Sequence, residues 1–418
     1  MGWPKVGVLG LAAALGACGA RSNLDVSETE PPGAGGASST SAITTASTGG
    51  GGAGTEAPQC TNLAWAGPPV GIGIAAATPA MRPRIIRSSP TTTVVVFEFP
   101  AGGGGLQELY SVPVTDAFDA WPPALGALEV HFPLVAPVAV SSGAVGEVAF
   151  STLDPVGGTT IMGRLEPEQN GSSFVDLPLF VPPFALAGTS NERFVLAVGP
   201  ESFMELYGVS TVVTPPLVQP IGSVGCADSP LAAEVVVDGD DFWIANTADQ
   251  PHDDCLDPDV PEAPRSFSVW RSEGSALMPI VSRTLPEALV DIDLAVADSV
   301  QWVGAQDVLG RYVVFGYGPD FSGIAMDELA PAAATYDLGV MRGDALVARV
   351  MPNGPPPEDT LRISLVSIFD GGITLAAPPE AQGAASGPAL LVEGDQALVT
   401  WADGFGTVWL GRVDCIAP

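Results

Sequence analysis

The densest group of potential metal ligands lies in one proline-rich segment near the middle of the chain. Carboxylate oxygens at close spacing are the ligands that Ca²⁺ prefers. The order DxDxDG of an EF-hand is absent, and acidic runs usually face solvent. We therefore favour a solvated loop, and keep a weak Ca²⁺ site as the alternative. The candidate ligands are Asp249, Asp253, Asp254, Asp257 and Asp259, beside His252 and Cys255.

Few residues are available for other chemistry. The only histidines are His131 and His252, and the only lysine is Lys5. The scarcity of histidine and lysine excludes multi-histidine metal centres, lysine Schiff bases and Walker-type phosphate loops. There is no GxSxG nucleophile motif. Glycoside hydrolysis needs only two carboxylates at a suitable separation, and the 47 acidic residues leave that reaction open without indicating a pair. The sequence identifies no catalytic residue, and we predict no cofactor apart from the weak Ca²⁺ site.

Composition limits both the fold and the partners. The 418 residues carry a formal net charge of −32, so nucleic acid is disfavoured as a partner. Hydrophobic residues make up 46% of the chain, which is enough for a large core. With 50 Gly and 41 Pro there is little room for long helices, and the composition favours an all-β protein.

The first eighteen residues predict the compartment. Lys5 precedes an apolar run over residues 6–17, which is too short to span a bilayer as a helix and is typical of a signal peptide. The run ends Leu15-Gly16-Ala17-Cys18, which resembles the lipobox of bacterial lipoproteins. The resemblance implies cleavage after residue 17 and fatty-acyl chains such as palmitate on Cys18, which would anchor the protein in a membrane.

Further features of the first sixty residues bear on localisation. Gly19 replaces the aspartate that signals inner-membrane retention in that family, which favours the outer membrane. The alternative is an ordinary secreted protein. Residues 18–58 are rich in Gly, Ser, Thr, Ala and Pro and predict a disordered linker. These sixty residues resemble uncharacterised surface lipoproteins of myxobacteria, a likeness that implies no activity.

The remaining cysteines predict two disulfides. Without Cys18 there are four, an even number that suits an oxidising compartment. Cys60 opens the region that we expect to be ordered, and Cys415 lies three residues from the end, so we predict a Cys60–Cys415 bond between the termini. Cys226 and Cys255 would form the second. Bound metal is the less favoured alternative, because no CxxC spacing occurs.

Residues 59–418 are expected to form one domain, and from Met81 to Pro418 the sequence repeats one pattern of three or four short strands. The last copy is the clearest, with strands predicted over 388–392, 396–401 and 407–413. The wider turns share the spacing DxxG, in which aspartate can bond the turn backbone and glycine can adopt positive φ. Successive copies begin 45 to 59 residues apart. The seven equivalent starts are Ile85, Val138, Ala187, Val236, Ala295, Val340 and Leu391.

Strand groups at this period are typical of the blades of a β-propeller. We predict seven blades, with six or eight as alternatives and an array of β-sandwiches as the other fold. A ring must join its first blade to its last, which the Cys60–Cys415 bond would do covalently. At the centre of the ring, converging carboxylates or arginines would favour an active site, and small apolar residues a scaffold.

Aromatic residues supply the remaining candidates. Asp403 and Thr407 near Trp409 are similar to the aspartate box of sialidase propellers, with the glycine one position late. Lectin-like binding through Trp121 or Tyr336 is a further hypothesis. Five tryptophans on expected strands are assigned to packing between blades. They are Trp243, Trp270, Trp302, Trp401 and Trp409.

These features together predict a membrane-anchored extracytoplasmic lipoprotein. Its propeller would bind an envelope protein or a glycan without catalysis. The alternative is a glycan-active hydrolase or lectin that uses carboxylates or aromatics on one face of the propeller.

Overall fold

A computed structural model describes residues 60–417 with gaps. The undescribed segments within that range are 73–80, 101–105, 143–146, 155–157, 167–170, 182, 189–192, 199–203, 211–214, 225–231, 239–240, 249–264, 274–275, 298–299, 319–320, 330–333, 352–360 and 368–370. The chain divides into two units, 1–48 and 49–418, and every described element belongs to the second.

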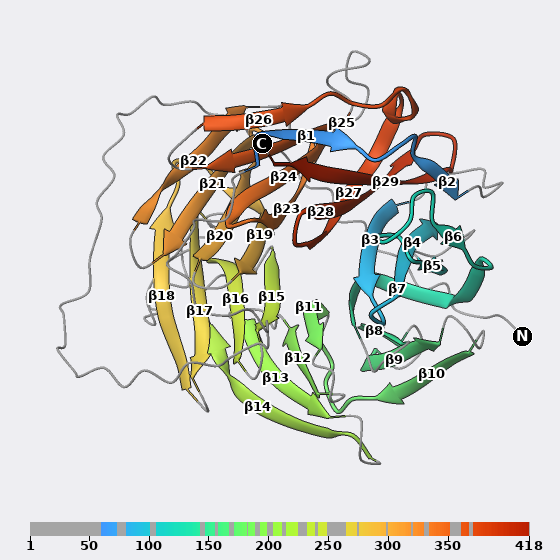
Figure 1. The fold of residues 1–418 in the computed structure, drawn as a ribbon. Helices are drawn as coiled ribbons and strands as arrows, with labels where there is room; N and C mark the ends of the chain where they lie inside the picture. The colour runs from blue at the N-terminus through green and yellow to red at the C-terminus, as the bar shows by residue number, and fades with distance from the viewer. Residues whose placement is uncertain are drawn as a thin grey trace, which may run out of the picture. The chain divides into compact units, whose positions relative to one another are not determined.

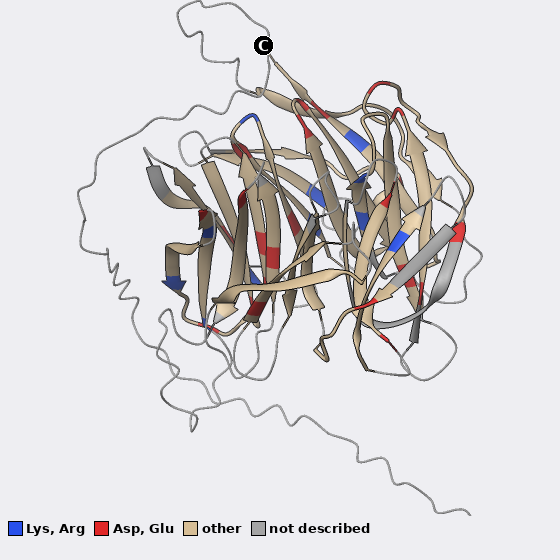
Figure 2. Cartoon of the chain, turned by 90° about the horizontal axis from the view of Figure 1, so that it is seen from below, with Lys and Arg blue, Asp and Glu red and all other residues tan. Residues whose placement is uncertain are grey.

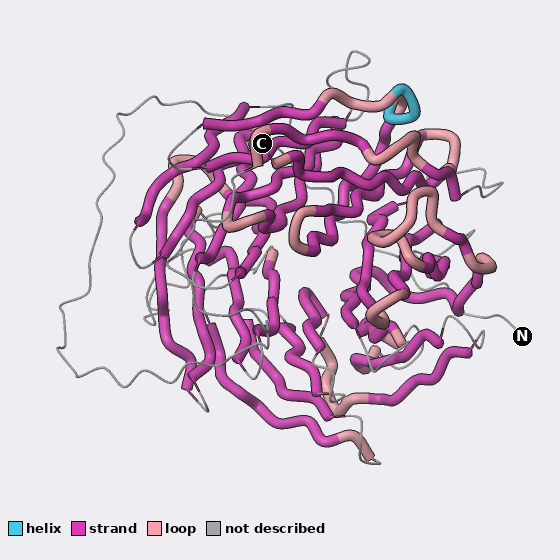
Figure 3. The backbone as a smooth tube through the Cα atoms, in the orientation of Figure 1, coloured by secondary structure: helices cyan, strands magenta, loops and turns pink. Residues whose placement is uncertain are grey.

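The described residues form a β-propeller of seven blades, as the repeat predicts (Figure 1). Five sheets make one blade each, and an eight-stranded sheet contains two. Apart from η1 (Pro379–Ala381), a 3₁₀ turn, all regular elements of the described residues are strands (Figure 3). The expectation of an all-β chain is therefore confirmed.

Blades 3 to 6 are regular antiparallel meanders of four strands, each running from the inside of the ring outwards. Blade 3 contains β11 (Pro183–Gly188), β12 (Arg193–Val198), β13 (Met204–Ser210) and β14 (Leu217–Val224), and blade 4 contains β15 (Ala233–Asp238), β16 (Asp241–Ala248), β17 (Ser266–Glu273) and β18 (Ala276–Thr284). Blade 5 contains β19 (Leu289–Ala297), β20 (Val300–Asp307), β21 (Arg311–Gly318) and β22 (Phe321–Leu329). Blade 6 contains β23 (Thr335–Met341), β24 (Asp344–Val350), β25 (Leu361–Ser367) and β26 (Gly371–Leu375).

Blades 1 and 2 share a strand that the repeat does not predict. The first half of β7 pairs with the third strand of blade 1, and its second half pairs with β8 as the inner strand of blade 2. The two blades therefore form one continuous sheet. Their strands are β3 (Met81–Arg87), β4 (Thr92–Pro100), β5 (Leu106–Thr115), β6 (Ala124–Leu125), β7 (Glu129–Ser142), β8 (Val148–Leu153), β9 (Thr160–Glu166) and β10 (Gly171–Asp176).

The N-terminal strand completes the last blade. β1 (Asn62–Trp65) pairs with β29 (Val408–Ile416) as its outer strand, and β2 (Val70–Ile72) pairs with the other end of β29. The inner strands are β27 (Ala384–Glu393) and β28 (Gln396–Asp403). Blade 7 thus combines both ends of the described chain, and hydrogen bonds close the ring.

The predicted Cys60–Cys415 disulfide lies at this closure. The two Cα atoms are 5.5 Å apart, a normal separation for a disulfide. Leu63 lies opposite Cys415 in the ladder, so the covalent bond and the strand pairing join the same two strands. The second predicted pair, Cys226 and Cys255, lies outside the described residues.

Burial falls from the middle of a blade to its outer strand. β20 and β21 are apolar and buried along most of their length, because neighbouring blades cover both of their faces. The outer strand β18 is mostly exposed. Trp243, Trp302 and Trp401 are buried between blades, and Trp270 and Trp409 are partly buried against the same packing, which confirms the role assigned to them.

The DxxG segments form capped turns. Asp403 accepts hydrogen bonds from the backbone N–H groups of Phe405 and Thr407 and from the indole of Trp409. Asp307 accepts two such backbone bonds, and φ is positive at Gly310 and Gly406. The likeness of Asp403 to an aspartate box is therefore structural, since its carboxylate is used within the turn.

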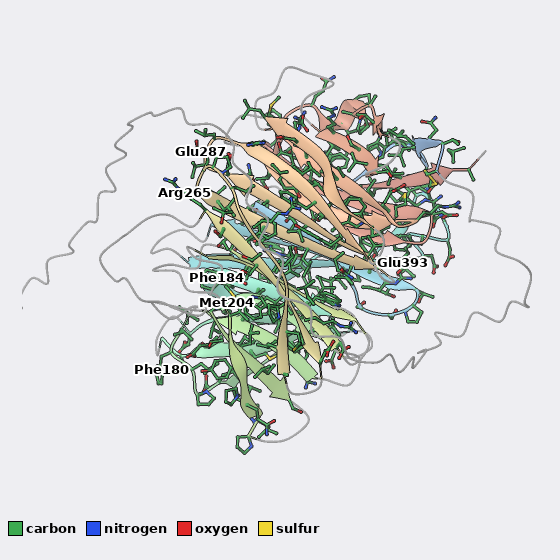
Figure 4. The ribbon with its side chains drawn as sticks, turned by 90° about the vertical axis from the view of Figure 1, so that its left-hand side faces the viewer. Phe180, Phe184, Met204, Arg265, Glu287 and Glu393 are labelled. Carbon is green, nitrogen blue, oxygen red and sulfur yellow. A yellow bond between two sulfur atoms is a disulfide. The ribbon has the colours of Figure 1, made fainter. Side chains whose placement is uncertain are left out.

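Each meander has two ends, which define two faces of the ring. The turn between the second and third strands of a blade lies at one end, with the connection to the next blade. The turn between the first and second strands lies at the other. In Figure 4, Phe180 and Glu287 lie at the first end and Glu393 at the opposite one. We call the first end the tip face. The end with Glu393, Cys60 and Cys415 is the tether face, where Cys415 N–H bonds the carbonyl of Asp395.

Within the described residues, no helix has the length and apolar character required to cross a membrane.

Candidate functional site

Charged side chains gather on the inner strands of the ring. Glu234 on β15, Asp293 on β19 and Asp337 on β23 occupy the same register position in three consecutive blades. They lie opposite Ala245, Gly304 and Ala348 of the second strands. We call these three acids with Arg84, which lies on the inner strand β3 of blade 1, the axial layer. Acidic and basic positions along the strands are coloured in Figure 2.

Two of these carboxyls connect neighbouring blades. An oxygen of Glu234 accepts a hydrogen bond from the N–H of Leu294, 2.5 Å away on the inner strand of blade 5. Asp337 accepts one from Leu390 N–H, 2.5 Å away on the inner strand of blade 7. Its other oxygen accepts from Leu338 N–H at 2.9 Å. Inner strands have an edge with no further strand beside it, so these carboxyls satisfy N–H groups that the ladders leave free.

Asp293 makes a different contact, within its own blade. It is 9% exposed and accepts a hydrogen bond from the hydroxyl of Tyr312, 2.5 Å away. The Tyr312 ring stacks on Tyr336 of blade 6, with centroids 3.9 Å apart and planes at 4°. Gly304 allows this arrangement, because a Cβ there would lie only 2.5 Å from the Cζ atom of Tyr312.

Burial, with the charges of neighbouring acids, raises the pKa of all three acids. Burial raises the pKa of Glu234 to about 8, with a further contribution from the charge of Asp337. Burial also raises the pKa of Asp337 to about 7, although the two N–H bonds and Arg84 act in the opposite direction. The pKa of Asp293 is raised well above its usual range, first by burial and then by Asp291. At neutral pH the axial layer therefore holds protons that ordinary carboxylates would have lost.

Two kinds of chemistry are consistent with such a layer. A protonated carboxyl can donate a proton as a general acid at neutral pH. It can also act as a structural acceptor that fastens one strand to another, which is how Glu234 and Asp337 are used here. In the described part of the chain, no three His, Cys, Asp or Glu side chains are close enough together to hold a metal ion.

Several predicted site residues lie outside the described residues. These are Cys18 and the whole acidic segment with Asp249, Asp253, Asp254, Asp257 and Asp259. Lipidation and Ca²⁺ binding therefore stay predictions.

The two aromatic residues considered for lectin-like binding are both used within the fold. Tyr336 is 6% exposed and stacks on Tyr312, so the hypothesis is wrong for this residue. The indole N–H of Trp121 donates to the carbonyl of Pro68 at 3.1 Å, and Arg412 lies over its ring. Trp121 therefore helps to hold the closing segment of blade 7, where the connection from β1 to β2 passes.

The most exposed aromatic side chains among the described residues lie instead on the tip face. Phe405 is 84% exposed and Phe180 74%. Leu309 occupies the same place in its turn as Phe405, two residues after the capping aspartate, and is 58% exposed. Because each aspartate holds its turn by backbone bonds, the apolar residue at the tip is presented in a fixed conformation.

The tether face has a different character, with ion pairs between blades. Arg87 of blade 1 contacts Glu393 of blade 7 at 2.8 Å, and Arg342 of blade 6 pairs with Asp395 in the same turn of blade 7. These ion pairs hold the last blade to both of its neighbours, so the charged side chains on this face already have partners within the propeller.

The sequence did not lead us to predict the axial layer, although it contains a pattern that indicates two of its residues. Two inner strands contain Asp-Leu-small-Val, at residues 293–296 and 337–340. An acid inside an apolar strand at the same place in two repeats indicates a shared inward position. The equivalent starts of the repeat place Asp293 and Asp337 close to each other in register, but they do not reveal which partners their carboxyls find.

No family model matches the chain, and no curated protein matches it in sequence. Similar solved structures are numerous and distant. They include YCF48 bound to D1 peptide, with 12% identity, a TM-score of 0.50, and coverage of 84% of this chain and 97% of the other. The β-propeller domain of the Trilobed protease from Pyrococcus furiosus has 8% identity, a TM-score of 0.45, and coverage of 82% and 95%. Sqt1 of Saccharomyces cerevisiae has 9% identity, a TM-score of 0.47, and coverage of 84% and 98%. At these identities the likeness concerns the fold alone.

Proposed function

We propose that the protein is an extracytoplasmic lipoprotein that is acylated at Cys18 and located at the outer membrane. Its propeller binds an envelope protein or a glycan without catalysing a reaction. The anchor is supported by the lipobox-like residues 15–18. An extracytoplasmic compartment is also supported by the Cys60–Cys415 disulfide, because such bonds persist in oxidising surroundings.

The observation that carries the binding role is the position of the exposed apolar tips. Phe180, Leu309 and Phe405 are on the tip face, whereas Cys60, where the linker joins the propeller, is on the tether face. A tethered propeller would therefore keep its apolar tips available to a partner. Exposed aromatic residues held on rigid turns are suited to act as anchors in an interface.

A non-catalytic role agrees with how the axial acids are used. Glu234 and Asp337 accept backbone N–H groups of adjacent blades, and Asp293 accepts the Tyr312 hydroxyl. Each carboxyl therefore has a structural contact. The alternative, a glycan hydrolase, is favoured by one observation: the pKa of about 8 at Glu234 would keep a proton available for a leaving group at neutral pH.

The anchor is tested by expressing the full chain in a bacterium with a labelled fatty acid. We expect the wild-type protein to incorporate the label and to sediment with membranes. The variant Cys18→Ser should lose both properties, because it removes the sulfur that carries the acyl group. Equal labelling of both proteins would contradict the assignment, and a soluble, unlabelled wild type would indicate ordinary secretion.

Binding is tested with the purified propeller on glycan arrays and on immobilised envelope proteins. For any ligand found, we expect Phe405→Ser to weaken affinity by about tenfold or more, the size of loss typical of an aromatic anchor. The control Ile416→Ser removes an aliphatic side chain that is 45% exposed on the tether face, and it should have little effect. Equal loss in both variants would remove the tip face as the binding surface.

The same protein is applied to a panel of glycoside hydrolase substrates. We expect no turnover. Cleavage that is abolished in Glu234→Gln or Asp337→Asn would overturn the non-catalytic proposal in favour of the hydrolase.

A further inference from the structure

In the axial layer, two carboxyls on inner strands each accept a backbone N–H from the inner strand of the next blade. Glu234 joins blade 4 to blade 5 through Leu294, and Asp337 joins blade 6 to blade 7 through Leu390. Blade 7 is also the blade that closes the ring, since β1 and β29 pair within it. The state of these two carboxyls therefore bears on how tightly the ring is closed.

The charged surroundings of these carboxyls are strongly unbalanced. The carboxyls of Glu234 and Asp337 interact with Asp291 and Asp293 of β19. Both also interact with Arg84 of β3, and Asp337 interacts with Tyr312 of β21. Arg84 also lies 4.0 Å from Glu98 of β4, so its charge is shared. β11 carries no titratable residue, and the single one on β27, Glu393, is paired with Arg87 on the tether face. One arginine thus faces four acids across the layer.

We propose that the axial layer is a pH-sensitive closure, in which Glu234 and Asp337 fasten neighbouring blades at low pH and loosen them as the pH rises through neutrality. A protonated carboxyl keeps an oxygen that accepts the N–H of the next blade, and it adds no charge to the cluster. An ionised carboxyl accepts the same bond but repels the other acids and loses its hydration, and separation of the blades relieves both effects.

The direction follows from linkage between protonation and folding. The pKa of Glu234 rises from 4.5 to about 8 in the folded chain, and that of Asp337 from 3.8 to about 7. At pH values between the ordinary pKa and the folded-state pKa of each group, the folded state holds a proton that the opened state releases. Stability from these groups is therefore complete below about pH 4 and is lost as the pH rises to about 8. Each carboxyl raises the opening constant by up to about tenfold per pH unit across its window.

Amide hydrogen exchange of the whole propeller measures this directly. Peptides that contain Leu294 and Leu390 are followed by mass spectrometry from pH 5 to pH 9, and rates are corrected for base catalysis of exchange. We expect their protection factors to fall at least tenfold between pH 5 and pH 8 and then to level off. Constant protection across this range would overturn the proposal, and this measurement needs no variant.

Variants identify the groups responsible. In Glu234→Gln with Asp337→Asn, both side chains still accept the N–H bonds but do not titrate, so the pH dependence should disappear. The control Asp327→Asn removes a carboxylate whose pKa Arg311 lowers, in an ion pair on the outer strand β22, and the fall should persist. A fall of the same size in the double variant would overturn the proposal. Should that variant not fold, Glu234→Gln alone should flatten the profile at Leu294 more than at Leu390, and equal profiles would overturn it.

Discussion

Removal of the Cys60–Cys415 disulfide is expected to lower the free energy of unfolding by about 5 kcal/mol, because the bond closes a loop of 355 residues in the unfolded chain. The loss is measured by urea unfolding of the double variant Cys60→Ser with Cys415→Ser against the wild-type protein. The serines fit in place of the sulfurs, and both positions lie at the end of the β1–β29 ladder, where the backbone bonds stay available.

Unfolding of the double variant with and without reducing agent supplies the matched comparison. If the Cys226–Cys255 bond also exists, reducing agent should lower the free energy of unfolding of the double variant further. If that bond does not exist, reducing agent should leave the double variant unchanged. An unfolding midpoint in the double variant equal to that of the oxidised wild type would contradict the first prediction. In that case the hydrogen bonds between β1 and β29, with the contacts of Trp65 to Trp401, would hold the ring closed without covalent help.

The repeat and its closure could be predicted because they depend on local patterns. Turns such as 393–396 and 403–406 are fixed by neighbouring residues, and the strands between them alternate or are continuously apolar. The expected last blade agrees with β27 to β29 within a few residues. The Cys60–Cys415 pairing could be predicted because the two cysteines lie at the two ends of the region expected to be ordered, and a ring brings those ends together.

Features that depend on register between distant strands could not be predicted. That β1 supplies the outer strand of blade 7 rests on a ladder between residues separated by more than 350 positions, such as Asn62 and Ile416. The division of β7 between two blades depends on irregular pairing with β5 and β8. The axial layer requires three blades to have the same register, so Glu234, Asp293 and Asp337 are recognised only when their inner strands are aligned.

The axial layer also changes how the acidic composition is interpreted. From the sequence, converging carboxylates at the centre would favour an active site. The structure does place acids there, but it gives Glu234 and Asp337 backbone partners on other blades and gives Asp293 a tyrosine. Convergence alone therefore does not distinguish catalysis from closure. The distinction rests on whether turnover or blade opening responds when these carboxyls are replaced.

Gly304→Ala is expected to destabilise the propeller by about 2–4 kcal/mol, because the new methyl group would overlap the Tyr312 ring and separate its hydroxyl from Asp293. Asp293 is buried, so it would lose its partner without gaining water. The measurement is the free energy of unfolding in urea. The control Gly404→Ala adds the same methyl group in a turn where nothing lies within 4 Å, and should change stability by less than about 0.5 kcal/mol.

A double-mutant cycle separates overlap from the lost hydrogen bond. Tyr312→Phe removes the hydroxyl, the atom nearest to the added methyl group, so its cost and that of Gly304→Ala should not add. We expect the double variant to be more stable than the sum of the two losses predicts, by about 1 kcal/mol or more. Additive losses in the free energy of unfolding would contradict this prediction, as would a Gly304→Ala protein as stable as the Gly404→Ala control. Either result would show that the position of Tyr312 does not depend on the absence of a side chain at residue 304. The contact between Tyr312 and Asp293 would then contribute little to holding the acid in the axial layer.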